Sequence, residues 1–286
     1  MKKISRRSFL AAAAVSAAAL ALTACGSSAS TASSAAASSV AASSEAASSE
    51  AASTSAAAAE LTTVEAGKLT MATNATFPPY EMTTDAGTIE GIDVDTAQAI
   101  AEKLGLELQI DDMDFDAALL SVQQGKADIA MAGITVTDER MAVMSFSDSY
   151  ATGIQSVIVP EGSDIASVDD LAGKKIGTQR GTTGYLYCSD DFGEDAVVAY
   201  DNGLTAVQAL NNGQVDAVVI DNEPAKAYVE SNPGLKILDT SYAEEDYAIG
   251  MAKGNTALLE AVNAALEELK ADGTLQAIVD KYIKAE

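Results

Sequence analysis

Short apolar runs alternate with helix-length segments through most of this chain, and this alternation constrains the fold more than any other feature. Residues 69–73 and 107–110 have the composition of strands, and residues 93–104 between them have a helical pattern. Asp93 suits the N-cap of that helix, and Gly105 suits its C-terminal stop. Strands that alternate with helices of about ten or more residues predict a parallel sheet covered by helices on both faces.

An internal repeat occurs within the alternating region. A helical segment, a Gly, a short loop, an Asp and a buried strand follow one another twice along the chain. The first unit contains residues 116–124, Gly125 and Asp128, and Gly213 and Asp216 hold the equivalent places 88 positions later. Each Gly suits a helix C-cap, because glycine adopts the left-handed conformation without steric cost. The repeat favours two similar α/β lobes, which also suit the length of the region better than one core.

Two further correspondences concern the ends of the expected strands. A looser repeat pairs residues 72–74 with residues 177–179. The offset of the stronger repeat pairs Gly133 with Asp221, and each of them follows the carboxyl end of an expected strand. Open α/β sheets bind ligands outside the carboxyl ends of their strands. We therefore expect Gly133 and Asp221 at a ligand site.

The N-terminus has the features of an export signal. Basic residues at positions 2, 3, 6 and 7 precede an apolar run over 9–24, which is short for a membrane span and typical of a signal peptide. The run ends in Leu-Thr-Ala-Cys, which resembles a lipobox. Residues 1–24 are therefore expected to be a lipoprotein signal peptide and Cys25 the lipidated residue, with an ordinary signal and a chance Cys as the alternative. Residues 5–10 also resemble a twin-arginine signal, so the export route stays open.

Residues 25–60 are expected to form a flexible tether after the lipidated Cys25. All but seven of residues 26–60 are Ser or Ala, so the segment lacks the large apolar side chains that build a core. A helix is the alternative, because Ala favours helices, but the segment has no amphipathic face. Acylation of Cys25 would hold the protein at the extracytoplasmic face of the cell membrane.

The composition excludes several classes of function. The chain has a net charge of −25 and no His. It therefore offers neither the basic surface that nucleic acid requires nor a His for catalytic triads or metal ligation. With Cys25 acylated, Cys188 has no disulfide partner, and we expect it to be a small buried apolar residue. We expect no catalytic residue, metal ion or cofactor, and a monomer.

Arg140 is the sharpest candidate for a ligand contact. Arg140 and Arg180 are the only arginines after the signal segment. Thr137 suits a helix N-cap, which places the Arg140 cation in the first turn, against the helix dipole. A guanidinium that grips a carboxylate through two hydrogen bonds would compensate for this. An exposed ion pair with Asp138 or Glu139 is the alternative.

Other candidates also follow expected strands. Asp221 could hold an ammonium group or cap the next helix, and an Arg in one lobe with an Asp in the other would suit a zwitterion. Phe77 and Phe115 lie in expected loops, where their rings could cover the apolar stem of a ligand or pack in the core. The Gly-Thr-Thr-Gly segment at 181–184 could present amides and hydroxyls to an anion at a helix N-terminus. It lacks the ending of a nucleotide-binding P-loop.

Five ordered motifs resemble those of the family 3 extracellular solute-binding proteins of polar amino-acid ABC transporters. The motifs are TNATFPPY at 73–80, GIDVD at 91–95, AGITVTDER at 132–140, FSD at 146–148 and VDAVVID at 215–221. The similarity covers nearly the whole of the folded part. It implies the type II fold of periplasmic binding proteins, in which two α/β lobes are joined by a hinge that the chain crosses twice. The implied lobes are 61–154 with 248–286, and 155–247.

The resemblance also implies roles for individual residues. In such proteins the Arg that matches Arg140 binds the ligand α-carboxylate, the acid that matches Asp221 binds the α-ammonium, and the rings that match Phe77 and Phe115 enclose the ligand side chain. Asn74 stands where binders of basic amino acids have an acid, which favours a neutral polar ligand. With Gly133 from the repeat, the expected binding residues are Asn74, Phe77, Phe115, Gly133, Thr135, Arg140, Gln179, Thr182, Thr183, Gly184 and Asp221.

The function implied by the resemblance is capture of a free amino acid and its delivery to an ABC permease and its ATPase. Two alternatives stay open. Some periplasmic dehydratases of prephenate or arogenate resemble the same fold, and they need a positioned acid or base in the cleft. A sensor that presents its closed form to a membrane receptor is the other alternative.

Overall fold

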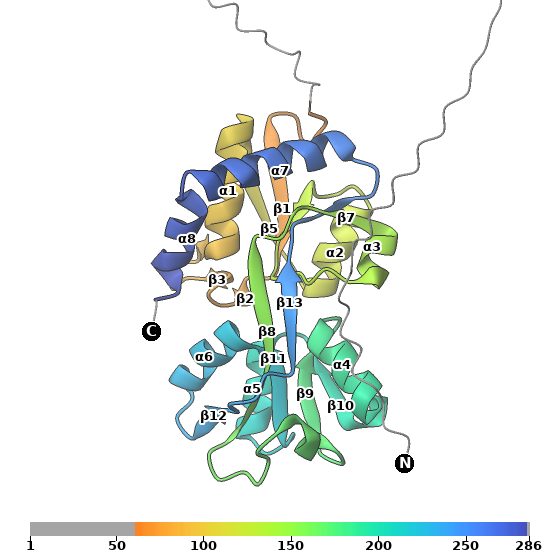
Figure 1. Cartoon of the computed structure of the whole chain (residues 1–286), viewed down its shortest axis with the longest axis vertical. Helices are drawn as coiled ribbons and strands as arrows, with labels where there is room; N and C mark the ends of the chain where they lie inside the picture. Colours follow the sequence, from red (N-terminus) through yellow and green to blue (C-terminus); the bar gives the residue numbers. More distant parts are fainter. Residues whose placement is uncertain (1–60, 285–286) are drawn as a thin grey trace, which may run out of the picture. The chain divides into compact units, whose positions relative to one another are not determined.

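Two α/β lobes form the part of the chain that the computed structural model describes, residues 61–284 (Figure 1). The first lobe has a five-stranded sheet with the order β5-β1-β6-β14-β7. Its strands are β1 (Lys68–Thr73), β5 (Glu107–Asp112), β6 (Ile129–Ala130), β7 (Met144–Phe146) and β14 (Gly250–Ala252). Its helices are α1 (Ile92–Leu104), α2 (Phe115–Gln123), α3 (Asp138–Val143), α7 (Thr256–Ala271) and α8 (Thr274–Tyr282). A small antiparallel sheet contains β2 (Thr76–Phe77), β3 (Glu81–Thr83) and β4 (Ile89–Glu90).

The second lobe has a six-stranded sheet, in which β10, β9, β11, β8 and β12 are neighbours in that order and β13 pairs with β8. Its strands are β8 (Ala151–Pro160), β9 (Ile176–Gln179), β10 (Val197–Tyr200), β11 (Ala217–Asp221), β12 (Leu235–Ile237) and β13 (Ala243–Tyr247). Its helices are α4 (Thr183–Phe192), α5 (Gly203–Asn211) and α6 (Asn222–Ser231), with 3-10 turns at Val168–Leu171 and Glu194–Ala196.

Both sheets are mixed, whereas the alternation of the sequence predicted parallel sheet. The prediction is correct for β1 with β5 and β6, and for β9 with β10 and β11. It is wrong for β14, which runs antiparallel to β6 and β7, and for β8, which runs antiparallel to β11. These strands belong to the segments that pass between the lobes, and a strand that arrives from the other lobe enters the sheet from the opposite end.

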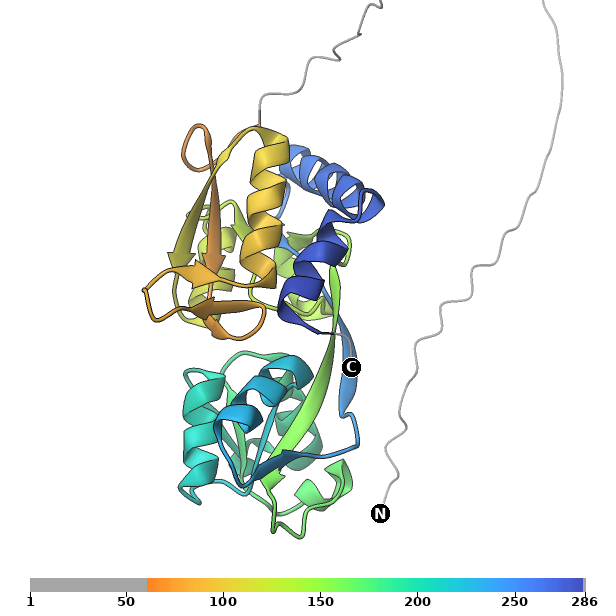
Figure 2. The ribbon, with the colours of Figure 1, turned by 90° about the vertical axis from the view of Figure 1, so that its left-hand side faces the viewer.

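An antiparallel ribbon of β8 and β13 connects the lobes. Its register pairs Ala151 with Tyr247 and Gln155 with Ala243, and the two strands lie side by side between the lobes in both views (Figures 1 and 2). The lobe boundaries expected from the sequence, 154/155 and 247/248, fall on this ribbon and its end, and they stay predictions.

The repeat found in the sequence is confirmed at the level of local structure. The C-caps of α2 and α5 are Gln124 and Asn212, one residue before the predicted Gly125 and Gly213, which have φ of 68° and 67°. The Asp128 carboxylate accepts a hydrogen bond from the backbone N–H of Thr70 at 2.8 Å, and the Asp216 carboxylate accepts one from Lys175 N–H at 2.8 Å. Each Asp therefore ties the loop after a helix to the start of a neighbouring strand. We call this arrangement of a helix, a Gly with positive φ, a loop with an Asp, and a buried strand the corner. Both lobes contain it.

The start of α1 differs from the prediction. The N-cap is Gly91, and Asp93 points inward and is fully buried. Gly91 has φ 144°, and a Cβ atom there would lie 2.1 Å from the carbonyl oxygen of Tyr80, so the chain passes too closely for a capping side chain. Gly105 is the C-cap, as predicted.

The two aromatic candidates lie in regular structure instead of the predicted loops. Phe77 is the last residue of the short strand β2, and Phe115 is the first residue of α2. The element β2 has only two residues, so it carries no alternating pattern that the sequence could reveal. In α2, Phe115 precedes the stretch whose helical pattern was recognised.

Helices cover both faces of each sheet, as predicted. Successive strand residues point to opposite faces, so Met71 and Ala72 pack in different apolar clusters, and so do Val218 and Val219. Each large side chain that is fully buried stabilises the fold by roughly 1.5–3 kcal/mol. Cys188 lies in the cluster of Val219, and burial raises the pKa of its thiol to about 12. Its prediction as a buried apolar residue is confirmed.

The predicted signal peptide (1–24), the lipidated Cys25 and the tether (25–60) lie outside the described residues, and these assignments stay predictions. Between residues 61 and 284, no helix has the length and apolar character needed to cross a bilayer.

Candidate functional site

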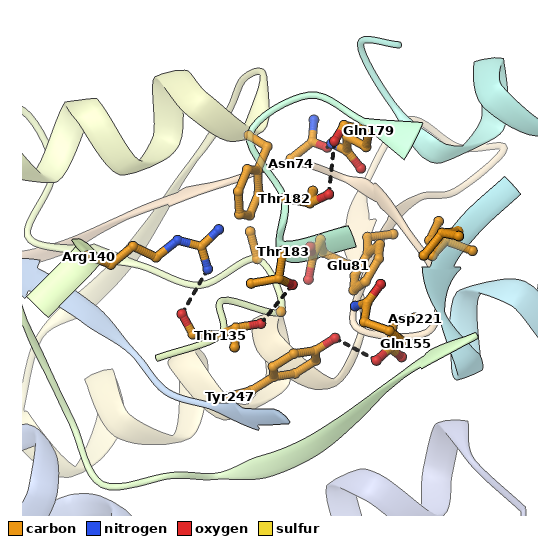
Figure 3. A pocket seen from close by; sticks show the side chains of 16 residues that line it. Asn74, Glu81, Thr135, Arg140, Gln155, Gln179, Thr182, Thr183, Asp221 and Tyr247 are labelled. Atoms are coloured by element: carbon orange, nitrogen blue, oxygen red, sulfur yellow. Dashed lines mark hydrogen bonds between the residues drawn. The ribbon is translucent and has the colours of Figure 1, made fainter. Parts of the chain in front are cut away.

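A cavity lies between the lobes, where β1, β6, β9 and β11 end (Figure 3). Every binding residue expected from the sequence lines it except Gly184. Glu81, Gln155 and Tyr247 also line it, and the sequence did not single them out. The carboxyl ends of the strands thus bring together side chains from both lobes, as open α/β sheets do at their ligand sites.

Arg140 reaches the cavity from the first turn of α3. Thr137 caps this helix by accepting the Arg140 backbone N–H at 3.2 Å, as predicted. The guanidinium donates from Nη1 to Thr135 O at 2.8 Å and from Nη2 to Gly181 O at 3.1 Å, and it lies 5.3 Å from the centre of the Phe115 ring. The side chain is buried, so the alternative of an exposed ion pair is wrong. None of these partners is charged, which leaves the cation available to an anion.

Asp221 caps the next helix, which is one of the two roles considered for it, and it also lines the cavity. Its Oδ1 accepts the Glu223 backbone N–H at 3.2 Å and caps α6. Its Oδ2 accepts the Tyr247 hydroxyl at 2.7 Å and the Ile154 N–H at 2.8 Å. Burial raises the pKa of Asp221 to about 6, and these three hydrogen bonds act in the opposite direction. The group is therefore mostly a carboxylate at pH 7, and both donors to Oδ2 come from the interlobe ribbon.

Asn74 and Gln179 connect the lobes through their side chains. Gln179 Nε2 donates to Asn74 Oδ1 at 2.9 Å, and Asn74 Nδ2 donates to Met113 O at 2.8 Å. These two amides hold equivalent places in the looser repeat, at the ends of β1 and β9, so the repeat brings them face to face. A further interlobe hydrogen bond runs from the Tyr228 hydroxyl to Thr76 O at 2.5 Å.

The predicted helix N-terminus at residues 181–184 is present. Thr182 caps α4 by accepting the Tyr185 N–H at 3.4 Å. The Thr183 hydroxyl lies 3.4 Å from the Thr135 hydroxyl of the other lobe, and both hydroxyls point toward the cavity (Figure 3). The N-terminus of a helix favours negative charge, so this segment and Arg140 present one attractive region to an anion.

Two of the candidate glycines make room for neighbouring side chains. Gly133 has φ 54°, and a Cβ atom there would lie 2.6 Å from Phe77 Cε1 and 3.2 Å from Tyr247 Cε2. A Cβ atom at Gly184 would lie 2.9 Å from Gln155 Oε1. Gly184 therefore borders the cavity through Gln155, which explains why it is not itself among the lining residues.

The ribbon contributes a buried polar pair behind the cavity. Gln155 Nε2 donates to Glu245 Oε2 at 2.9 Å. Burial lowers the pKa of Arg140, and the Glu245 carboxylate is the largest of the charges that act against this. Gln155, Glu245 and Tyr247 were missed because the pairing of β8 with β13 brings them here from positions about ninety residues apart, and neither strand carries a local motif.

Glu81 was also missed. It follows the recognised motif at 73–80 directly, yet nothing in its spacing separates it from the other acids of a strongly acidic chain. Its side chain is fully buried, lines the cavity and contacts Asp93. Asp93 in turn accepts the Gly133 N–H at 3.0 Å and the Tyr150 hydroxyl at 2.7 Å.

The family model for bacterial extracellular solute-binding proteins, family 3, matches residues 69–285. The chain belongs to this family. The chain is similar to a probable histidine-binding protein from Neisseria gonorrhoeae, which is 34% identical over 222 residues, or 76% of this chain and 83% of the relative. The L-cystine-binding protein TcyJ from Escherichia coli strain K12 is 33% identical over 226 residues, or 78% of this chain and 85% of the relative.

Solved structures agree with this family membership. An ancestral arginine-binding protein bound to arginine superposes with a TM-score of 0.73 and 43% identity, covering 76% of this chain and 98% of that structure. The arginine-, lysine-, histidine-binding protein ArtJ from Geobacillus stearothermophilus superposes with a TM-score of 0.73 and 33% identity, covering 77% and 96%. The type II binding-protein fold implied by the sequence motifs is therefore confirmed, and the family 3 proteins are solute-binding proteins of transport systems.

Proposed function

We propose that this protein is the extracytoplasmic substrate-binding lipoprotein of an ABC importer, and that it captures one free amino acid between its lobes. One observation carries the proposal: Arg140 and Asp221, of opposite charge, line the same buried cavity from different lobes. A free α-amino acid is a zwitterion that presents a carboxylate and an ammonium group on one carbon atom. Two fixed charges of opposite sign therefore recognise the part that all amino acids share.

The contacts around each charge support this orientation of the ligand. Arg140 is held by two neutral carbonyl groups, so its planar fork can bind a carboxylate. The hydroxyls of Thr135 and Thr183 and the N-terminus of α4 lie on the same side. Asp221 is positioned to accept the ammonium group, and the rings of Phe77 and Phe115 line the space for the side chain.

The side chain that the cavity accepts has two candidates. A neutral polar side chain is the first, because Asn74 and Gln179 offer amide groups that can donate and accept hydrogen bonds. A cationic side chain is the second, because Glu81 places a carboxyl group in the same cavity. Relatives named for cystine, histidine and arginine binding support the amino-acid class and leave both candidates in place.

The remaining assignments complete the proposal. The lobes comprise 61–154 with 248–286, and 155–247, and they close about the β8–β13 ribbon. Residues 1–24 are the signal peptide, Cys25 carries the lipid anchor, and 25–60 are the tether. The closed form delivers its ligand to the permease and its ATPase. A transport role fits the family better than the dehydratase or sensor alternatives, because its members are solute-binding proteins of transport systems.

A thermal-shift screen against the free amino acids and cystine tests the proposal. A ligand at about 100 times its Kd stabilises the native state by roughly 2.7 kcal/mol. We expect at least one amino acid to raise the melting temperature of the parent and of Arg180→Ala, whose exposed Arg lies outside the cavity. We expect the same amino acid to leave Arg140→Ala unshifted. Turnover of prephenate, or an Arg140→Ala protein that responds like the parent, would contradict the proposal.

A further inference from the structure

Two buried carboxyl groups contact each other at one wall of the cavity. Glu81 is on β3 and Asp93 is on α1, and both have no solvent-exposed surface. The Asp93 backbone N–H donates to Tyr80 O at 2.9 Å, which brings Asp93 beside the residue next to Glu81, and the two carboxyl groups interact directly. Glu81 lines the cavity, whereas Asp93 lies behind it and does not. We call these two residues the acid pair.

The donors around the acid pair are distributed unequally. Asp93 Oδ1 accepts the Tyr150 hydroxyl at 2.7 Å, and Asp93 Oδ2 accepts the Gly133 N–H at 3.0 Å. Neither oxygen of Glu81 has a donor among the residues of the described chain. A hydrogen bond between two carboxyl groups requires a proton between them. The unequal donors place that proton on Glu81, so that Glu81 donates and Asp93 remains a carboxylate.

The charges around the acid pair also favour a retained proton. The titratable groups that face it are Tyr80, Asp112, Tyr150 and Tyr228. Burial, and then the charge of Asp93, raise the pKa of Glu81 well above its usual range, and burial raises the pKa of Asp93 to about 6. Lys281 of α8 is bound to Asp95, the next acid along α1, at 2.6 Å. Two like charges in contact cannot both ionise without a compensating cation.

We infer that Glu81 and Asp93 share one proton at neutral pH, and that this proton passes to solvent when a ligand places a cationic group against Glu81. The inference rests on the proposed function and develops its cationic candidate. Before binding, the acid pair carries one negative charge. After binding, it carries two negative charges beside one positive charge of the ligand, so the total charge of the buried region is unchanged. A neutral side chain brings no replacement for the proton, which then stays.

The proton exchange has a measurable consequence for affinity. If binding releases one proton, the affinity for L-arginine falls about tenfold for each unit by which the pH drops below the pKa of the ligand-free acid pair. Asp221, whose pKa is about 6, receives the ammonium group that all amino acids share. It therefore gives L-arginine and L-glutamine the same pH dependence. The difference between the two ligands isolates the acid pair.

Calorimetric titration of the full-length chain in two buffers of different ionisation enthalpy counts the protons released. At pH 7 we expect about one proton to be released by L-arginine and none by L-glutamine. In Glu81→Gln the amide replaces the protonated carboxyl group with nearly the same shape and can still donate to Asp93. We expect this variant to release no proton, to bind L-arginine at least tenfold more weakly, and to bind L-glutamine within threefold of the parent.

The matched control is Glu90→Gln, which removes an exposed carboxylate from the neighbouring strand β4 and should behave like the parent with both ligands. L-Arginine binding without proton release, equal proton release from Glu81→Gln, or binding of neutral amino acids alone would each overturn the inference and leave the proposed function standing. If no amino acid binds, the proposed function fails. In that case, carbon-13 NMR titration of the two carboxyl groups tests whether they share a proton. Two independent carboxyl titrations below pH 5 would overturn the inference.

Discussion

The two lobes share a structural corner but give the cavity opposite chemistry. In both lobes a helix, a Gly with positive φ, an Asp and a buried strand follow one another. The residue at the carboxyl end of this region then differs, because the first lobe has Gly133 where the second has Asp221, the last residue of β11. The first lobe supplies the cation Arg140, and the second supplies the anion and the N-terminus of α4. The repeat sets the scaffold, and single residues at the strand ends set the charge.

The Asp of the corner is more buried and accepts more hydrogen bonds in the first lobe than in the second. Asp128 is buried and accepts two backbone N–H groups, from Val64 at 2.7 Å and from Thr70 at 2.8 Å. Asp216 is exposed and accepts one, from Lys175 at 2.8 Å. The first lobe therefore depends more on its corner than the second does. Similar local sequences thus do not imply similar energetic weight.

The charge difference between the lobes predicts the largest effect. Arg140→Ala and Asp221→Asn should each weaken binding of the amino acid found by the screen by about 3–5 kcal/mol, or two to three decades or more. Each change leaves a buried charge of the ligand without its partner. Arg140→Lys should restore binding only in part, because an ammonium cannot form the planar fork. Calorimetric titration measures these losses, and binding of both variants within threefold of the parent would remove the assignment.

The corner comparison predicts an effect on stability. Asp128→Ala should lower the free energy of unfolding by about 2–3 kcal/mol, because the buried Thr70 N–H and the N–H of the more exposed Val64 both lose their acceptor. Asp216→Ala should lower it by less than half as much, since water can reach the N–H group that it frees. Urea denaturation followed by circular dichroism gives both values. Equal losses would show that the two corners contribute equally to the free energy of unfolding.

The amide contact between the lobes predicts a coupling. Asn74→Ala and Gln179→Ala should each reduce ligand affinity, and the double variant should lose about 1 kcal/mol less than the sum of the two. The reason is that the bond from Gln179 Nε2 to Asn74 Oδ1 is lost once in either case. A double-mutant cycle by calorimetry measures the coupling. Strict additivity would mean that the amides act separately.

The smallest expected effect concerns the two glycines that follow the C-caps of α2 and α5. Gly125 and Gly213 have nearly the same φ, and a Cβ atom at either would meet nothing within 4 Å. Replacement by Ala should cost about 0.5–1 kcal/mol at each site, because the left-handed conformation is unfavourable for Ala and the reduced freedom of the unfolded chain offsets only part of that cost. The two losses should agree, and thermal unfolding measures them. If the two losses differ by more than the smaller of them, the two corners are not equivalent.

Local patterns predicted the scaffold and the charged ends of the site, and tertiary pairing supplied the rest. Thr137 as a cap, Gly105 as a stop and the repeated corners follow from rules that act within a few residues. Asp93 was misassigned as a cap because its burial depends on the close passage of Tyr80. No local rule could distinguish such a contact, because the partners are distant along the chain.

The residues that the sequence missed share this origin. Tyr247 and Gln155 reach the cavity only because β13 pairs with β8. Glu81 gains its significance only from its contact with Asp93 on another element. Each of them is polar and buried, and each depends on a partner from a different segment. A single sequence contains their identities but not their pairing.

The tyrosine hydroxyls around the cleft give the protein an optical signal of its own state. Tyr247 donates to Asp221 and Tyr150 donates to Asp93, while Tyr228 reaches across the cleft to Thr76. A phenol that is hydrogen-bonded to a carboxylate emits weakly, and its emission recovers when that bond is lost. The chain has nine Tyr and no Trp, so no indole fluorescence masks this light. Ultraviolet emission from the unlabelled protein should therefore change when a ligand engages either carboxylate or when the lobes separate.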